Sequence, residues 1–214
     1  MKKLLLMFAL MLALVSCQCS GNGGNEPALN GVQPVLGGIQ VENVNKTDFE
    51  TMFAKYGQAD LFRWYECEIL LNDFLDEEGE GGIAELVNIF QVVNAIDSTS
   101  FDTYVYKIQH FPNSKVLTDS VNGFWIQNEP ITLDEIKVPY DSACAIVAAV
   151  NYPKPHSRHV TLRKPLGPVP CNTQWIFGNI REQIWIDAVT GEARKSNPAF
   201  PEEKGFKMPL GEWP

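Results

Sequence analysis

Two histidines three residues apart, His156 and His159, are the first candidates for a metal site. On a helix this spacing would place both imidazoles on one face, where they could share a metal ion. Pro153 and Pro155 precede them and disfavour a helix. On a strand the same spacing sends the two side chains to opposite faces. We therefore expect solvated loop residues and predict no metal centre.

A cluster of carboxylates is the second candidate, because hard cations such as calcium prefer several oxygen ligands. Its spacing lacks the EF-hand pattern, so a solvated acidic turn is the favoured interpretation. The carboxylates concerned are Asp73, Asp76, Glu77, Glu78 and Glu80.

Nucleophilic catalysis has weak support in the sequence. Cys67 lies in an apolar segment without a histidine nearby, so a cysteine nucleophile would need a histidine brought in by folding. The G-x-S-x-G elbow, the G-x-G-x-x-G turn and the P-loop are all missing. We predict a non-enzymatic protein without a cofactor.

Four cations lie close together in an otherwise acidic chain: Lys154, Arg158, Arg163 and Lys164. One interpretation is a basic patch that receives an acidic segment of a protein partner. The other is that these side chains balance neighbouring carboxylates.

The N-terminal residues resemble the signal peptide of a bacterial lipoprotein. Lys2 and Lys3 precede an apolar run over residues 4–15. As a helix that run spans about 18 Å, too short for a hydrocarbon core of about 30 Å. Small or apolar residues then lead to Cys17, as in a lipobox. We expect removal of residues 1–16 and attachment of lipid to Cys17, which anchors the chain to a membrane.

The resemblance to exported lipoproteins of Bacteroidetes-type bacteria implies a location. The acidic residues that often follow the lipidated cysteine in surface-exported members are missing here, so we expect an outer-membrane anchor facing the periplasm. Loss of the leader removes two lysines, leaving 15 basic against 26 acidic residues and a net charge of −11. This charge disfavours nucleic acid as a partner.

The remaining cysteines allow several disulfide pairings. Cys19 lies beside the anchor, and Cys67, Cys144 and Cys171 are spread along the chain. An exported compartment permits disulfides. Cys144 and Cys171 flank the same unit and are the preferred pair, with free buried thiols as the alternative.

Stepwise along the chain, a polar tether over residues 17–45 leads into an N-terminal α+β unit over residues 46–130. There we expect a helix over 48–56 capped by Thr47, a strand over 62–74 and, from apolar spacing, a second helix over 83–95. Strands over 102–111 and 115–127 complete the unit, the latter as one strand or as a hairpin turning at 122–123.

The second unit covers residues 131–195. We expect extended chain over 131–138, then a helix over 142–150 capped by Asp141. Strands are predicted over 159–163, 173–178 and 183–187, with a tight turn at 190–191. A Pro-rich tail over 196–214 follows, in which Trp213 packs back on the domain. A helix precedes strands in both units, which hints at a duplication.

The second unit resembles PepSY-like domains, whose relatives include β-lactamase-inhibitor-like folds. The resemblance rests on the helix followed by a meander, on the segments 160–168 and 174–178, and on the ending Ile184-Trp185-Ile186-Asp187-Ala188-Val189-Thr190-Gly191-Glu192-Ala193. It covers about a quarter of the chain. It implies a non-catalytic envelope module that binds or restrains secreted proteins.

Together these observations predict an α+β fold, in which helices pack on one face of an antiparallel sheet, as two related units or one fused sheet. The expected function is a lipid-anchored envelope protein that binds a protein or peptide. An envelope hydrolase with a site formed only in the fold, and a carrier for a small glycan or lipid, are the alternatives.

Overall fold

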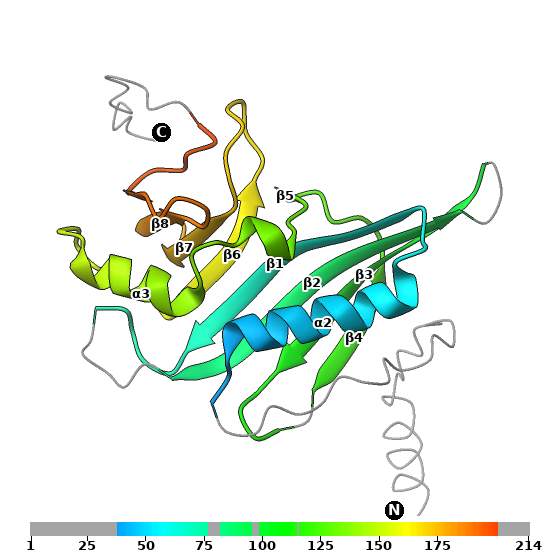
Figure 1. The fold of residues 1–214 in the computed structure, drawn as a ribbon, viewed down its shortest axis with the longest axis horizontal. Helices are drawn as coiled ribbons and strands as arrows, with labels where there is room; N and C mark the ends of the chain where they lie inside the picture. Colours follow the sequence, from blue (N-terminus) through cyan, green and yellow to red (C-terminus); the bar gives the residue numbers. More distant parts are fainter. Residues whose placement is uncertain (1–37, 77–81, 96–98, 115, 201–214) are drawn as a thin grey trace, which may run out of the picture. The chain divides into compact units, whose positions relative to one another are not determined.

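The computed structural model describes residues 38–76, 82–95, 99–114 and 116–200, all within one compact unit of residues 31–214. Figure 1 shows helices lying along an antiparallel sheet. The described elements are α2 (Val41–Tyr56), β1 (Leu61–Leu71), β2 (Ile83–Ala95), β3 (Phe101–His110), β4 (Leu117–Asn122), β5 (Asn128–Glu129), a 3-10 turn (Leu133–Glu135), α3 (Tyr140–Ala149), β6 (His159–Pro165), β7 (Gln174–Gly178), β8 (Gln183–Asp187) and β9 (Ala193–Arg194).

One sheet joins the two predicted units. Its order is β4-β3-β2-β1-β6-β7-β8-β9, and β5 pairs separately with β6. β1 and β6 pair antiparallel at the centre, and each is followed by strands that step outward to an edge. Each half is therefore a helix followed by an antiparallel meander. The expected α+β class is confirmed, in the form of one fused sheet.

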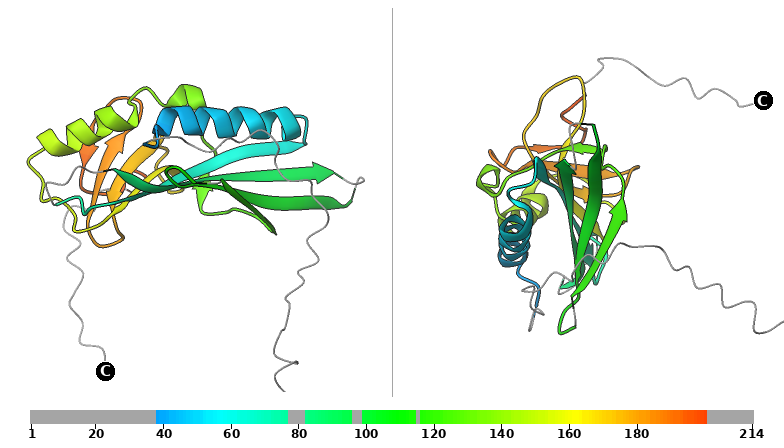
Figure 2. Two further views of the ribbon diagram at one scale, coloured as in Figure 1. Left: turned by 90° about the horizontal axis from the view of Figure 1, so that it is seen from below. Right: turned by 90° about the vertical axis from the view of Figure 1, so that its right-hand side faces the viewer.

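Both helices lie on the same face of the sheet, as the left view of Figure 2 shows. α2 covers the first half, where Phe49 packs edge-on against Phe62 and Trp64. α3 covers the second half, where Tyr140 contacts Trp175 and Phe177. Trp64, Trp175 and Phe177 are almost completely buried. The main core therefore lies between the helices and the sheet.

Neither of the two described helices lies on the opposite face, which we call the open face. Residues paired across strands share a face, and successive residues alternate. Cys67 pairs with Asn88 and belongs to the helix face, since Asn88 bonds Asp48 of α2. Glu68 and its partners Val87 and Thr161 therefore lie on the open face.

The first helix begins earlier than the sequence predicts. α2 starts at Val41, within the expected tether, and Thr47 is an interior residue whose hydroxyl bonds the Asn43 carbonyl at 2.7 Å. The buried stripe of α2 includes Val41, Val44 and the polar Asp48. A buried aspartate at a core position breaks the apolar periodicity, so the pattern hides the first turns of the helix.

The predicted helix over 83–95 is wrong, because this segment is β2. Residues 86–92 are all buried, since α2 covers one face of β2 and a later segment covers part of the other. A strand buried on both faces loses its alternating pattern and reads as a continuous apolar run. The helical spacing of the apolar residues in this segment is therefore a coincidence.

The other element predictions mostly hold. The strands expected at 62–74, 102–111, 159–163, 173–178 and 183–187 match β1, β3, β6, β7 and β8. Segment 115–127 contains a single strand, β4, and no hairpin. α3 starts at Tyr140 after Pro139, so Asp141 is not its cap. Segment 131–138 contains a 3-10 turn in place of the expected extended chain.

Several predictions fall outside the described residues. These are the leader over 1–16, Cys17, Cys19, most of the tether, Glu77, Glu78, Glu80 and Trp213. Among the described residues, no helix is both long and apolar enough to cross a bilayer.

Candidate functional site

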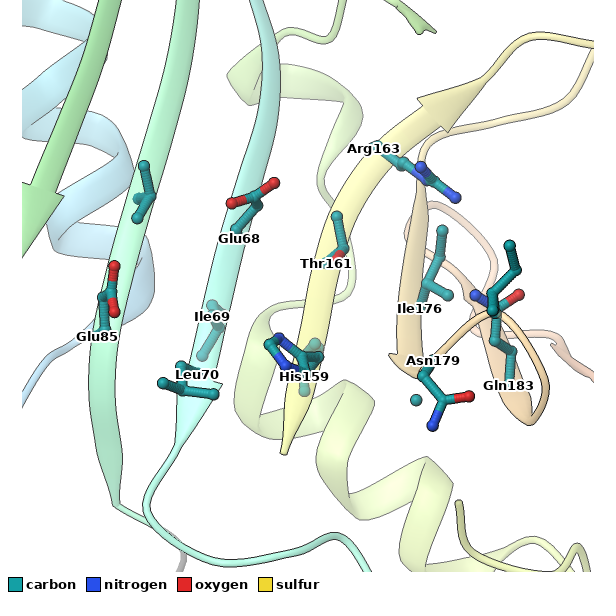
Figure 3. Close-up of a pocket in the computed structure, with 14 residues that line it drawn as sticks. Glu68, Ile69, Leu70, Glu85, His159, Thr161, Arg163, Ile176, Asn179 and Gln183 are labelled. Atoms are coloured by element: carbon teal, nitrogen blue, oxygen red, sulfur yellow. The ribbon is translucent and has the colours of Figure 1, made fainter. Parts of the chain in front are cut away.

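The open face is hollowed by a groove between the two halves of the sheet. Its larger part has a volume of about 480 Å³ and lies over β1, β2, β6 and the β7–β8 hairpin, as Figure 3 shows. A second part of about 240 Å³ continues towards β4. Glu68, Glu85 and Val87 line both parts. The groove therefore runs across the strands rather than along them.

A segment of irregular chain crosses the same face between β4 and β5; we call residues 123–127 the strap. The Trp125 ring packs on the open-face residues Val87, Ile89 and Val105. Its backbone N–H donates to Gln91 Oε1 at 2.6 Å. The strap thus covers the part of the open face formed by β2 and β3 around Val87, Ile89 and Val105.

A buried carboxylate fixes the end of the strap. Asn128 Nδ2 donates to Glu66 Oε2 at 2.6 Å, and Glu66 is only 4% exposed. Burial and the neighbouring Glu68 carboxylate raise the pKa of Glu66 to about 7, against the lowering effect of Arg163. The strap is therefore attached to the sheet through a group that titrates near neutral pH.

Exposed apolar side chains concentrate around the groove and the strap. Leu117 and Val121 of β4 lie on the open face, because they pair with Gln109 and Val105. They are 53% and 57% exposed, while Phe124 and Ile126 of the strap are 68% and 77% exposed. Ile180, at the β7–β8 hairpin that borders the groove, is 94% exposed. Such a surface is typical of a protein-interaction site.

The four predicted basic residues do not form one patch. Lys154 bonds the Val147 and Val150 carbonyls at the end of α3. Arg158 donates to the Leu71 carbonyl at 2.6 Å. Lys164 approaches Glu129 and Glu135 at 3.8 and 3.6 Å. Among the four, only Arg163 lines the groove.

The two histidines are also separated. The His156 ring stacks on Phe74 at 4.1 Å between centroids, and its Nδ1 contacts Asp76 at 3.0 Å. This pair attaches the β1–β2 connection to the segment before β6. His159 lies at the end of the groove. Among the described residues, three or more potential metal-ligating side chains do not come together.

Beneath α2, Cys67 of β1 and His110 of β3 share the helix face, separated by β2. His110 Nε2 contacts both Asp48 oxygens at 3.0 and 2.9 Å, and Asn88 Nδ2 donates to the same carboxylate. Cys67 is fully buried, and burial raises the pKa of its thiol well above the usual value. Because the thiolate is the nucleophile, this environment disfavours a cysteine hydrolase. The cluster serves to attach α2 to the sheet.

The preferred disulfide is not present in the structure, where Cys67, Cys144 and Cys171 are free thiols. Cys144 lies on α3 beside Tyr140, and burial raises its pKa to about 11. Cys171 lies in the loop before β7, where its Sγ approaches the Pro165 carbonyl. The two cysteines are thus placed in different surroundings.

The tight turn predicted at 190–191 is present between β8 and β9. Asp187 Oδ1 accepts from the Val189 and Thr190 amides at 2.9 and 2.8 Å. Gly191 has a φ of +77°, and Glu192 is exposed. Burial opposes ionisation of Asp187, but the bonds from Thr190, Asn172 and Val189 outweigh it and lower its pKa.

The sequence analysis did not single out the groove residues Glu68 and Glu85. Glu68 and Leu70 alternate along the predicted strand over 62–74, a spacing that places both side chains on one face. Glu85 was missed because its segment was interpreted as a helix.

Comparison of the chain with protein-family models, with curated proteins and with solved structures found no match.

Proposed function

We propose that this chain is a non-catalytic, lipid-anchored protein of the bacterial envelope that binds another protein or a peptide on its open face. The observation that carries the proposal is a sheet face, left uncovered by both described helices, that combines a groove with exposed apolar side chains. Exposed Phe124, Ile126 and Ile180 have the character of anchors that a partner would bury.

The groove suits a polypeptide better than a lipid or glycan carrier. Carriers enclose their ligands in deep, mostly apolar cavities of at least about 300 Å³. The apolar hollow between α2 and segment 133–139 has about 210 Å³, below that range. The larger groove is open and lined by charged residues of three strands. Its shape and polarity favour a macromolecular surface.

The anchor and the location are part of the proposal. Support comes from Lys2 and Lys3, the apolar run over 4–15 and the position of Cys17. The neutral residues after Cys17 favour the periplasmic side of the outer membrane. We further propose that the second half is a PepSY-like, inhibitor-type module, supported by α3, the meander β6–β9 and the turn at Gly191.

Site-specific photo-crosslinking in the native envelope tests the proposal. A photoreactive residue at Val121 or Ile180 reports on the open face, and one at Ala148, exposed on α3, is the matched control. We expect a discrete protein adduct from both open-face positions and none from Ala148. Adducts from Ala148 alone, or from no position, would refute binding on the open face.

A further inference from the structure

Each of the two cations that line the groove, Arg163 and Lys107, faces a carboxylate directly across a neighbouring strand. Arg163 of β6 pairs in register with Glu66 of β1, and Arg163 lowers the pKa of that carboxyl. Lys107 of β3 pairs in register with Asp119 of β4. Directly opposed side chains of opposite charge stabilise each other. Each of these two cations therefore has a carboxylate directly opposite it, and Arg163 is also the diagonal neighbour of Glu68.

Two carboxylates of the groove lack such a cation. The partners of Glu68 in register are Val87 and Thr161, and that of Glu85 is Leu70. Glu85 accepts a hydrogen bond from the neutral Gln109 amide. Among the ion pairs between described residues, none includes Glu68 or Glu85.

The two carboxylates also lie within reach of a single ligand group. Glu85 is the diagonal neighbour of Glu68 on adjacent antiparallel strands, a relation that separates the Cα atoms by about 7–8 Å. Figure 3 shows both side chains on the same face of β1 and β2. A planar guanidinium inserted between them can donate to both.

Apolar side chains line part of the groove around this pair. Leu70 and Val87 lie beside the carboxylates, and Ile176 and Ile180 line the opposite side of the groove. A side chain with an apolar stem and a cationic end matches this surrounding, because its stem buries apolar area while its charge meets the acids.

We infer that the groove recognises a basic side chain, with arginine preferred, in an apolar segment of a partner protein, held between Glu68 and Glu85. The inference rests on the proposed function, since it names the chemistry of the partner on the same face. Charge complementarity selects this occupant: a segment with an acidic or neutral residue at that position leaves both carboxylates uncompensated.

Binding of short peptides to the purified full chain, followed by NMR at low salt, tests the inference. The probe is the capped pentapeptide acetyl-Val-Leu-Arg-Leu-Val-amide. Its control replaces arginine with citrulline, which keeps the shape and loses the charge. We expect the arginine peptide to bind about tenfold more tightly, with shifts confined to β1, β2 and β6, and the preference to shrink in high salt.

Substitutions test whether the two carboxylates cause the preference for the arginine peptide over the citrulline peptide. Glu68→Gln changes an exposed residue, so it should preserve the fold and reduce the preference severalfold; adding Glu85→Gln should abolish it. Asp141→Asn, an exposed change on α3, should leave it intact. Equal binding of both peptides, no binding at several millimolar, or a preference that survives the double substitution would overturn the inference. Crosslinking of a partner through Val121 and Ile180 would still support binding on the open face in that case. Failure of arginine recognition is therefore distinguishable from failure of the proposed function.

Discussion

The Glu66 carboxyl makes the stability of the protein depend on pH in an unusual direction. Its pKa is about 7 in the folded chain against an ordinary 4.5, because burial disfavours the charged form. The folded state therefore holds this proton more tightly than the unfolded state. As pH rises from about 4.5 to about 7 the folded state loses stability, on the order of 3 kcal/mol in total.

Glu66→Gln keeps an acceptor for Asn128 and removes the titration. We expect the variant to match the native protein near pH 5 and to exceed it in stability at pH 8. Urea denaturation across this range measures the effect. Glu50→Gln, on the exposed side of α2, is the control and should retain the native slope. If the free energy of unfolding changed equally with pH in the native protein and in Glu66→Gln, the burial of this carboxyl would be contradicted.

Gly191 illustrates how one residue fixes a turn. Its φ of +77° is unfavourable for side-chain-bearing residues, and an added Cβ would lie 3.3 Å from Ile146 Cδ1 of α3. Gly191→Ala should cost about 1–2 kcal/mol in the free energy of unfolding. Gly38→Ala, where an added Cβ meets no atom within 4 Å, should be nearly neutral. Similar losses from both substitutions would argue against this turn.

At the scale of elements, the readability of the apolar pattern affected which predictions succeeded. β3 places Tyr104, Tyr106 and Ile108 on its helix face, and this spacing of two predicts a strand. β2 is buried on both faces, and its pattern lost the period of two. In α2, Asp48 occupies a core position, where Asn88 and His110 form hydrogen bonds with its carboxylate. These contacts join segments far apart in the sequence, so the local pattern around Asp48 does not predict them.

The groove was predictable only in part for the same reason. Alternation along a strand puts Glu66 and Glu68 on one face, but their relation to Glu85 and Arg163 depends on the order and register of the strands. The strap was also out of reach, since an Asn-Gly pair favours a hairpin, whereas the chain after Gly123 crosses the open face towards β5. The helix and the following strands predicted for the second half are confirmed as α3 and β6 to β8.

The strap contributes to stability through one ring. Trp125 is half-buried on Val87, Ile89 and Val105, so Trp125→Ala should destabilise the protein by about 2 kcal/mol. Phe124→Ala removes a neighbouring ring that is 68% exposed and should change stability by less than about 0.5 kcal/mol. Chemical denaturation of both variants measures the difference. Equal effects would mean that the strap does not pack on the sheet.

At the scale of the whole molecule, the arrangement leaves one side of the sheet available. α2 and α3 both cover the helix face, and the main core lies beneath them. A partner can therefore bind the open face without disturbing the core. The proposed anchor would hold the domain near a membrane while that face remains accessible.

The anchor is tested by a single substitution. Cys17→Ser removes the only sulfur in the proposed lipobox, so incorporation of radiolabelled palmitate should be lost and the protein should leave the membrane fraction. Cys19→Ser, two residues away, should keep both properties. Labelling that persists in Cys17→Ser, or that depends on Cys19, would contradict lipidation at Cys17.

The most direct test of binding on the open face is a titration of the partner captured by crosslinking at Val121 or Ile180 against two matched variants. Ile180→Glu places a charge on the 94%-exposed hairpin residue beside the groove, and Ala148→Glu places one on the outer surface of α3. A partner on the open face would lose at least tenfold in affinity for Ile180→Glu and bind Ala148→Glu as it binds the native chain. Unchanged affinity for Ile180→Glu, together with a loss for Ala148→Glu, would place the interaction on the helix face instead.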